Sequence, residues 1–389
     1  MPITPTRRCA VLATTLRPTR QARLTVGAID AATYLAAGDL YGGRSFLQNP
    51  SWAQVKPDWR PELLAWRDAD GEIVGTALVL HRGVPGVRRS FAYLPEGPDI
   101  DWTDPALDRW LTPLIEHLVE GGAFAVRLGP PPALRRWKAA TLKTAAGPSL
   151  RIGDVLPDLV EPVGSSVSDR LRSLGWARCE DGGDAQPRFV FQVPLPSLDG
   201  VLTAMNSEWQ RNLKKSVRSG IETRIGAEGD LPAFYQLLQT TERRNGFRLG
   251  RTLGYYQRQY RALNAEAPGR MRLYLASYEG EVLAAHTMNV VGRRVWYQTG
   301  ASASHRRDVR PSHALQWRMM QDAFKHGAAY YDMRGISDCL DPGRREYGLL
   351  RWKLGTGGDV VETLGEWELT LPGVVNQTLH HAMRRYRAR

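Results

Sequence analysis

The same succession of strands and helix occurs twice in this sequence. Residues 63–97 contain two strand-like runs around a turn at Gly71, and then a second turn and an aromatic third run. Residues 272–302 repeat this order around Gly280. A chain that carries one strand pattern twice, at nearly constant spacing, is expected to fold into two similar units.

A helix and a further strand follow each of these meanders. The apolar residues of the two helices recur at one-turn spacing: Trp110, Leu114 and Leu118 in the first, and Leu315, Met319 and Ala323 in the second. Gly122 and Gly327 end the two helices, as glycine does where a chain leaves a helix in a left-handed conformation. The repeat therefore predicts an α+β fold with two similar domains in tandem.

The segment between the two repeats is polar and rich in glycine and proline around residues 180–200. We place the domain boundary there, with a first domain over residues 24–185 and a second over residues 186–372. Residues 1–23 are expected to form a loose N-terminus, and residues 373–389 a basic C-terminal helix. No long heptad run occurs, so no coiled-coil arm is expected.

Net charge, apolar runs and cysteine spacing indicate which kind of partner and which cellular compartment to expect. The 389 residues carry a net charge of +12, which favours nucleic acid, a phosphorylated substrate or an acidic membrane surface as partner. No apolar run approaches the ~20 residues that cross a bilayer, and the apolar stretch near the N-terminus is too short for a secretory signal. We therefore expect a cytoplasmic protein without a transmembrane segment. Cys9, Cys179 and Cys339 lie far apart and are expected to be reduced thiols.

Motifs of several cofactor-dependent enzyme classes are missing. The sequence has no dinucleotide fingerprint, P-loop, zinc-protease motif or serine-hydrolase elbow, so we expect neither a cofactor nor a metal. Three strands, a helix and a strand resemble a GNAT acetyltransferase domain, in which a glycine-bearing loop at a helix N-terminus holds the pyrophosphate of acetyl-CoA. The matching segment, residues 306–312, contains no glycine. The acyl donor is therefore expected not to be CoA.

Eight short segments occur in an order that resembles one protein family. They are SFLQNPSWAQVK, YLPEGP, QPRFVFQVPL, RNLKKSVRSG, ERRNGFR, YYQRQYRAL, WYQTGAS and the stretch from YDMRGI to GEWEL. The set covers residues 45–370 and looks like the FemABX aminoacyltransferases of peptidoglycan bridge synthesis. The resemblance implies two GNAT-like domains, in agreement with the repeat.

The resemblance also implies roles for individual residues. Positions that contact the acceptor in the family are matched by Lys56, Arg251, Tyr255 and Tyr297. Lys353 matches the lysine at the reaction centre. Trp352 replaces the family's phenylalanine and keeps a face that can stack on the terminal adenosine of a tRNA. From residue type and spacing alone, the same residues are also compatible with ordinary surface or core-edge positions.

Two departures from the family pattern bear on the acceptor rather than on the fold. Met333-Arg334 stands where a small, uncharged pair is usual. Thr356 stands where an aromatic residue is common.

The segment RNLKKSVRSG predicts a basic amphipathic helix. Ser207 can cap it and Gly220 can end it, with Trp209, Leu213 and Val217 as its apolar stripe. The basic face consists of Arg211, Lys214, Lys215 and Arg218. These four cations either contact the phosphates of the tRNA acceptor stem or form a solvated face.

The implied reaction transfers glycine, alanine or serine from an aminoacyl-tRNA to an amine, most simply in the stem peptide of a peptidoglycan precursor. Lys353 is predicted to lie near the oxyanion that develops when the amine attacks the ester. The alternatives are tRNA-dependent aminoacylation of a natural-product intermediate and CoA-dependent N-acyl transfer.

A non-catalytic RNA- or membrane-binding protein is a further alternative. The C-terminal segment places Leu379, Met383 and Tyr386 on one side of a basic helix and leaves His380 solvated. The same segment allows peripheral contact at the inner face of the membrane for a cytoplasmic enzyme.

Overall fold

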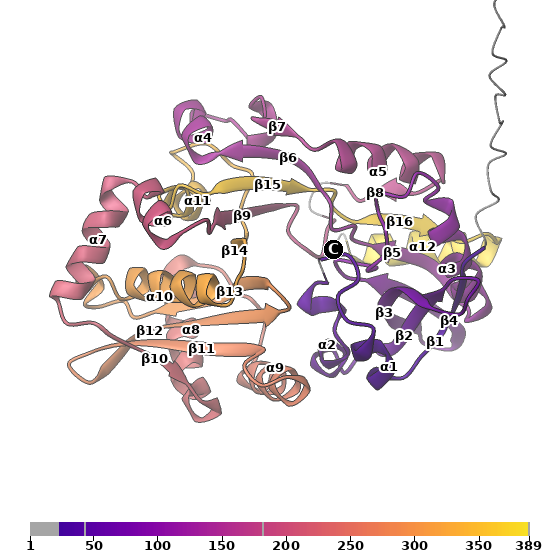
Figure 1. Cartoon of the computed structure of the whole chain (residues 1–389), viewed down its shortest axis with the longest axis horizontal. Helices are drawn as coiled ribbons and strands as arrows, with labels where there is room; N and C mark the ends of the chain where they lie inside the picture. Colours follow the sequence, from indigo (N-terminus) through magenta and orange to yellow (C-terminus); the bar gives the residue numbers. More distant parts are fainter. Residues whose placement is uncertain (1–22, 43, 181–182, 388–389) are drawn as a thin grey trace, which may run out of the picture.

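The structure is a computed structural model that describes residues 23–42, 44–180 and 183–387. It is a mixed α+β protein in which two β-sheets lie side by side, with helices packed on both (Figure 1). The expected loose N-terminus lies almost wholly outside the described residues.

The first sheet has seven strands in the order β1-β2-β3-β4-β5-β16-β8. Their bounds are β1 Thr25–Ala28, β2 Arg60–Arg67, β3 Ile73–Val84, β4 Val87–Leu94, β5 Ala123–Leu128, β16 Trp367–Thr370 and β8 Ala177–Arg178. The helices of this part are α1 Ala31–Ala36, α2 Pro50–Val55, α3 Asp108–Glu120, α5 Pro162–Ser173 and α12 Val374–Arg387.

The second sheet has nine strands in the order β10-β11-β12-β13-β14-β9-β15-β6-β7. Their bounds are β10 Glu222–Gly226, β11 Met271–Tyr278, β12 Glu281–Val291, β13 Arg294–Ser302, β14 Tyr330–Gly335, β9 Phe189–Pro194, β15 Asp359–Thr363, β6 Ala133–Lys138 and β7 Leu159–Val160. The helices are α4 Ala139–Ala145, α6 Leu198–Ala204, α7 Ser207–Arg218, α8 Leu231–Asn245, α9 Leu253–Glu266, α10 Pro311–Lys325 and α11 Tyr347–Leu354.

The internal repeat is confirmed. The turn between β2 and β3 and the turn between β11 and β12 both use a glycine with positive φ, 85° at Gly71 and 80° at Gly280. Gly122 after α3 and Gly327 after α10 both have φ of 80°. All six residues predicted to form the apolar faces of α3 and α10 are buried: Trp110, Leu114, Leu118, Leu315, Met319 and Ala323.

The two halves of the chain exchange strands. β16, from the second half, lies in the first sheet between β5 and β8, whereas β9 begins the second half and lies in the second sheet between β14 and β15. β6 and β7, which precede residue 185, also belong to the second sheet. Each sheet therefore contains strands from both halves, and the expected boundary at residues 185/186 falls in the crossing between β8 and β9.

Only the second sheet is open between its two central parallel strands. In the first sheet, β4 and β5 pair from Ser90–Ala123 to Leu94–Leu128. In the second, β13 and β14 pair only at Val295–Tyr331 and Trp296–Asp332. Beyond Trp296, β13 pairs with β12 through Ser302, with a bulge opposite Thr287 and Met288.

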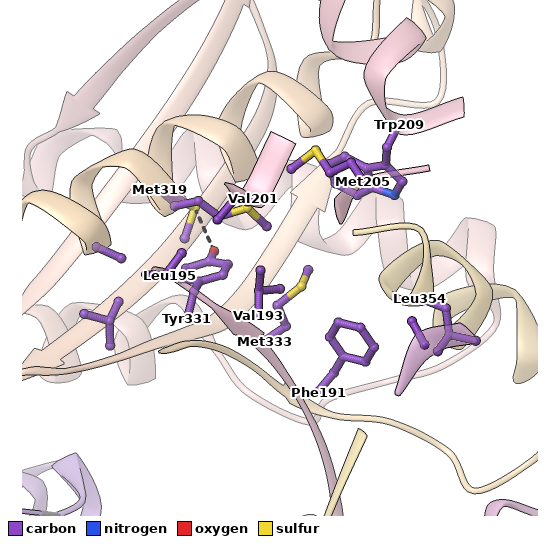
Figure 2. Packing of buried hydrophobic residues seen from close by; sticks show 14 of the residues in the cluster. Phe191, Val193, Leu195, Val201, Met205, Trp209, Met319, Tyr331, Met333 and Leu354 are labelled. Carbon is purple, nitrogen blue, oxygen red and sulfur yellow. Dashed lines mark hydrogen bonds between the residues drawn. The ribbon is translucent and has the colours of Figure 1, made fainter. Parts of the chain in front are cut away.

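Alternate side chains of β14 point to opposite faces of the sheet, one set into the core and the other into a cavity. Figure 2 shows Tyr331 and Met333 pointing into the core, near Phe191 and Val193 of β9. Asp332 and Arg334 alternate with them and line a cavity on the other face of the sheet. The core thus fixes the strand from which both cavity residues project.

Two details of the basic helix were predicted wrongly. The N-cap of α7 is Asn206 and not Ser207, because its side-chain oxygen accepts the N–H of Trp209 at 2.9 Å. Val217 is 76% exposed, whereas Trp209 and Leu213 are buried as predicted. The apolar stripe is therefore shorter than expected, and an apolar side chain stands in the open beside the basic face.

The C-terminal helix forms as predicted, but its apolar side faces the protein. Leu379 and Met383 pack against a cluster around Phe91 and Phe124 of the first sheet. His380, predicted to be solvated, is buried because its ring bonds Glu368 at 2.9 Å and Thr370 at 2.6 Å. The side chain of Tyr386 lies outside the described residues. No helix among the described residues is long and apolar enough to cross a membrane.

Candidate active site

Lys56, Arg251 and Tyr255 lie together, as the sequence predicts. Lys56 caps the C-terminus of α2, and its Nζ lies 5.8 Å from the ring centroid of Tyr255 and 5.6 Å from that of Trp52. The guanidinium carbon of Arg251 lies 5.0 Å from the same Tyr255 ring. Thr252 is the N-cap of α9, and its side-chain oxygen accepts the N–H of Tyr255. Arg251 directly precedes this cap, and its guanidinium lies over the Tyr255 ring.

The electrostatics of this cluster suit an anion. Burial lowers the pKa of Lys56, and neighbouring Arg251 lowers it further, while Asp58 opposes the shift. Burial raises the pKa of Tyr255. The Tyr255 hydroxyl is buried and finds no hydrogen-bond partner among the described residues. The two cations beside this tyrosine can together bind a phosphate group, which offers several acceptor oxygens.

The first two sequence motifs are held together by Gln48. Its Nε2 donates to the carbonyl of Pro95 and its Oε1 accepts the N–H of Leu78, both at 2.9 Å. A Cβ on Gly97 would lie 2.4 Å from the Gln48 side chain, so only glycine fits there. The motif QNPSW, which leads to Lys56, is thereby anchored to the motif LPEGP.

An ion pair that the sequence did not suggest joins the two sheets. Arg334 donates to Glu96 at 2.7 Å and to Gln186 at 3.1 Å, and Ser45 donates to the other oxygen of Glu96 at 2.6 Å. Burial raises the pKa of Glu96, but Arg334 and Ser45 lower it more, so the pKa lies below its usual value. The four residues come from four of the sequence motifs. Because the four residues are distant in the chain, local sequence pattern could not show that they meet.

A cavity of about 770 Å³ lies where the two sheets meet. Its lining carries paired charges, among them Glu96, Arg136, Asp332 and Arg334. Burial raises the pKa of Asp332 even though Arg334 opposes the shift. None of the six residues predicted for the acceptor and the reaction centre lines this cavity: Lys56, Arg251, Tyr255, Tyr297, Trp352 and Lys353.

Lys353 is buried on α11 and faces the end of β14. Its ammonium donates to the carbonyl oxygens of Met333 at 2.6 Å, Arg334 at 3.3 Å and Gly335 at 2.9 Å. Only 2% of the residue is exposed. Burial lowers the pKa of Lys353 to about 7, and Asp332 opposes this shift. The lysine therefore holds the backbone of the segment that carries Arg334, whose φ is 59°.

Trp352 belongs to an aromatic cluster with side chains of α7 and α10. Its ring centroid lies 5.1 Å from that of Trp209 on α7 and 6.0 Å from that of His313 on α10. The indole of Trp209 also donates to the Trp352 carbonyl at 2.8 Å. Burial lowers the pKa of His313 to about 4, so this imidazole is neutral at neutral pH. The Trp352 side chain is half-buried.

Tyr297 lies apart from the Lys56 cluster. It is packed beside the core of α7 and α10, and its ring centroid is 5.3 Å from that of His286. Its hydroxyl fills the space that a side chain at Gly300 would need. Tyr255, in contrast, packs in the core of α8 and α9. The structure therefore unites three of the four residues predicted to contact the acceptor and places Tyr297 along the open strand β13.

Residues 39–279 match the model of the FemAB family. The chain belongs to the FemAB family. Residues 207–353 also match the acetyltransferase (GNAT) domain, which confirms the predicted fold for the second half. The match spans β13, α10 and β14, the elements around the open strand pair.

Curated relatives of this chain are aminoacyltransferases. The UDP-N-acetylmuramoylpentapeptide-lysine N(6)-alanyltransferase of Weissella viridescens is 26% identical over 74% of this chain and 79% of its own. The lipid II:glycine glycyltransferase of Staphylococcus saprophyticus is 23% identical over 86% of this chain and 90% of its own. Among solved structures, FemX superposes with a TM-score of 0.76 and 21% identity, over 92% of this chain and 99% of FemX. The FemX likeness shows that the two chains share the whole fold.

Proposed function

We propose that this FemAB-family aminoacyltransferase moves one amino acid from a charged tRNA to an amine of a peptidoglycan precursor. The observation that carries the proposal is the cluster of Lys56, Arg251 and Tyr255, which suits the phosphate of a carrier-linked acceptor. The named relatives act on such precursors and transfer alanine or glycine. We propose glycine, alanine or serine as the donor amino acid here.

We assign the donor to the second half of the chain. There the parallel strands β13 and β14 stop pairing after Trp296, and Tyr297 follows directly on β13. Trp352 packs on Trp209 of α7, and Trp209 packs on His313 near the start of α10. In the first half, β4 and β5 stay paired along their length. Trp352 offers the terminal adenosine a stacking face.

The reaction needs alignment more than activation, because an aminoacyl ester is already reactive. The acceptor amine forms a C–N bond with the ester carbonyl carbon, and the C–O bond to the ribose breaks. The amine loses a proton, and the ribose oxygen leaves as a hydroxyl. Holding both substrates in line supplies much of the acceleration.

We propose for Lys353 a positioning role at this reaction centre. In the structure its ammonium reaches three backbone carbonyls and thereby shapes the segment 333–335 at the end of β14. A segment fixed in this way sets the width of the opening between β13 and β14. A direct contact between Lys353 and the oxyanion would require these hydrogen bonds to open.

An amine acceptor other than a cell-wall precursor is the second candidate. It is favoured by Arg334, since a large cation bonded to Glu96 stands where the family has a small, uncharged residue. We place the reaction in the cytoplasm at the inner face of the membrane, where charged tRNA and a lipid-linked precursor meet.

A panel experiment tests the proposal and separates the two acceptors. Purified protein is incubated with single charged tRNAs and with a lipid-linked precursor, a soluble nucleotide-linked precursor or small amines. Mass spectrometry is expected to find one added amino acid on a peptidoglycan precursor. Addition only to small amines would favour the second candidate, and no addition from any charged tRNA would refute tRNA-dependent transfer.

A further inference from the structure

A second cavity of about 690 Å³ lies between α7 and α10, away from the junction of the sheets. It is lined along α7 by Gln210, Leu213, Lys214, Val217 and Arg218, and along α10 by Ala314, Trp317, Arg318 and Gln321. The α10 residues span about two helical turns, or roughly 10 Å at 1.5 Å per residue. We call this cavity the α7/α10 groove; its length suits an extended ligand.

The groove divides the basic face of α7 into two pairs. Lys214 and Arg218 line it, while Arg211 and Lys215 do not. Lys215 instead lies 3.5 Å from Asp308. Of the four cations predicted to contact tRNA, two therefore face a shaped cavity and two face elsewhere.

The floor of the groove is apolar and aromatic. Val217 is 76% exposed although it belongs to a helix whose other apolar residues are buried. Trp317 is partly buried against the core and lines the groove with Leu202 and Ile221. Contacts to duplex phosphates need cations alone, whereas a single strand also needs faces on which its bases stack. Cations above an aromatic floor thus match a single-stranded nucleic acid.

The groove begins beside the aromatic cluster of the donor side. His313, whose ring centroid lies 4.5 Å from that of Trp209, directly precedes Ala314 of the groove. Trp209 in turn directly precedes Gln210 and contacts Trp352. A strand that ends at Trp352 is therefore close to the first groove residues of both α7 and α10.

We propose that the α7/α10 groove binds the unpaired 3′ segment of the charged tRNA, immediately before its terminal adenosine. One base stacks on Trp317, and the phosphates of the segment bind Lys214 and Arg218. The inference rests on the proposed function, because it supplies the donor with a path to the reaction centre. The protein reads a single strand here, so a duplex of the same length is a poorer ligand.

Two double variants with equal charge change test the groove. Lys214→Ala with Arg218→Ala removes the groove cations, and Arg211→Ala with Lys215→Ala removes the other two from the same helix. The probe is a fluorescent single-stranded RNA with the sequence of a tRNA 3′ end, measured by anisotropy in the full chain at fixed salt. We expect the groove double variant to lose at least about tenfold in affinity and the control at most about threefold.

Trp317 tests the stacking step without changing charge. Trp317→Ala should weaken RNA binding by about tenfold, and Trp317→Phe should keep most of it, because a phenyl face still stacks. Thermal unfolding identifies variants that fail to fold. If Trp317→Ala does not fold, RNA binding by Trp317→Phe is compared with that of Trp317→Leu instead.

Three outcomes would overturn the inference. If both double variants lose the same RNA affinity, the effect is a general attraction between charges and not binding in the groove. If neither variant loses affinity, the RNA binds elsewhere. Tighter binding of a blunt RNA duplex, or groove-dependent binding of anionic lipid vesicles without RNA binding, would assign the groove to another ligand. Wild-type transfer with an unchanged KM for charged tRNA in the groove double variant would refute the groove and leave the proposed function intact.

Discussion

The ammonium of Lys353 donates a hydrogen bond of 2.6 Å to the carbonyl oxygen of Met333. Two further bonds to the next two carbonyls occupy the remaining N–H groups of the lysine. The residue that matches the reaction centre of the family is thus part of a backbone clamp. The positioning role proposed for Lys353 rests on this clamp, because a buried lysine that holds the backbone need not reach open space.

Replacing Lys353 by methionine keeps the apolar stem and removes all three hydrogen bonds. We expect the free energy of unfolding to fall by about 1–3 kcal/mol, because buried carbonyls lose their donor. Displacement of the opening should lower kcat by about 10²–10³, the cost typical of losing one preorganised contact. Lys325→Met, on the surface of α10, is the control. Turnover within about threefold of wild type in folded Lys353→Met would contradict the positioning role.

The pH dependence of stability gives the same clamp a second readout. Burial lowers the pKa of Lys353 to about 7, whereas in the unfolded chain it keeps its usual value near ~10.4. Between these two values the unfolded chain holds the additional proton, so raising the pH stabilises wild type relative to Lys353→Met. Chemical denaturation at several pH values should show a constant difference below pH ~6 and a growing one above pH ~7. A difference that does not change up to pH ~10 would contradict the lowered pKa.

The ion pair between Glu96 and Arg334 is expected to hold the two sheets in register. Arg334→Met leaves the partly buried carboxylate of Glu96 without its cation and should cost about 1.5–3 kcal/mol, while Glu96→Gln with Arg334→Met should recover part of this loss. Because the pKa of Glu96 is lowered in the fold, its contribution exists above the unfolded pKa and is lost as pH falls through the folded one. Denaturant titration of the double-mutant cycle measures the coupling. Additive effects of the two substitutions would show that the pair is not coupled.

The acceptor cluster makes a kinetic prediction. Lys56→Ala and Arg251→Ala should each raise the KM for a phosphate-bearing acceptor by about tenfold or more and change kcat little, since each removes a charge-assisted contact. Arg261→Ala on the outside of α9 is the matched control. Steady-state kinetics with acceptor as the varied substrate checks this, and normal acceptor KM in both variants would move the binding site elsewhere.

The strand exchange predicts that neither half folds by itself. A fragment of residues 24–185 lacks β16, which pairs with β5 and β8, and exposes β6, which pairs with β15 in the intact chain. Unpaired strand edges of this kind favour aggregation. The full chain should unfold in one transition by both circular dichroism and tryptophan fluorescence. A soluble fragment with cooperative unfolding would contradict the prediction.

The sequence was informative where local pattern decides structure. Turn glycines such as Gly71 and Gly280 and the apolar spacing of α3 and α10 reveal the duplication, because both depend on residues close in the chain. The exchange of β6, β7 and β16 between the two sheets was missed, since the sequence of a strand does not encode its pairing partner. His380 was misjudged for a related reason: it is buried through Glu368, which belongs to a strand and not to its own helix.

The same limit applies to the site. Lys56, Arg251 and Tyr255 could be proposed as acceptor contacts because family motifs carry them. Glu96 and Arg334 stand in such motifs too, but only the fold shows that they meet. The groove cations Lys214 and Arg218 could not be separated from Arg211 and Lys215 by helical spacing, because the position of α10 decides which of them line the cavity.

The central claim is that this chain transfers an amino acid from tRNA and does not transfer an acyl group from CoA. The segment before α10, residues 306–312, carries no glycine, and Arg306 and Arg310 occupy positions of positive φ that glycine usually takes. The decisive measurement is a single-turnover assay in which a radiolabelled aminoacyl-tRNA and acetyl-CoA are offered separately with a purified peptidoglycan precursor. We predict that label appears on the precursor from the aminoacyl-tRNA and that no thiol is released from acetyl-CoA. Thiol release with acetylated precursor, and no transfer from any charged tRNA, would contradict the account.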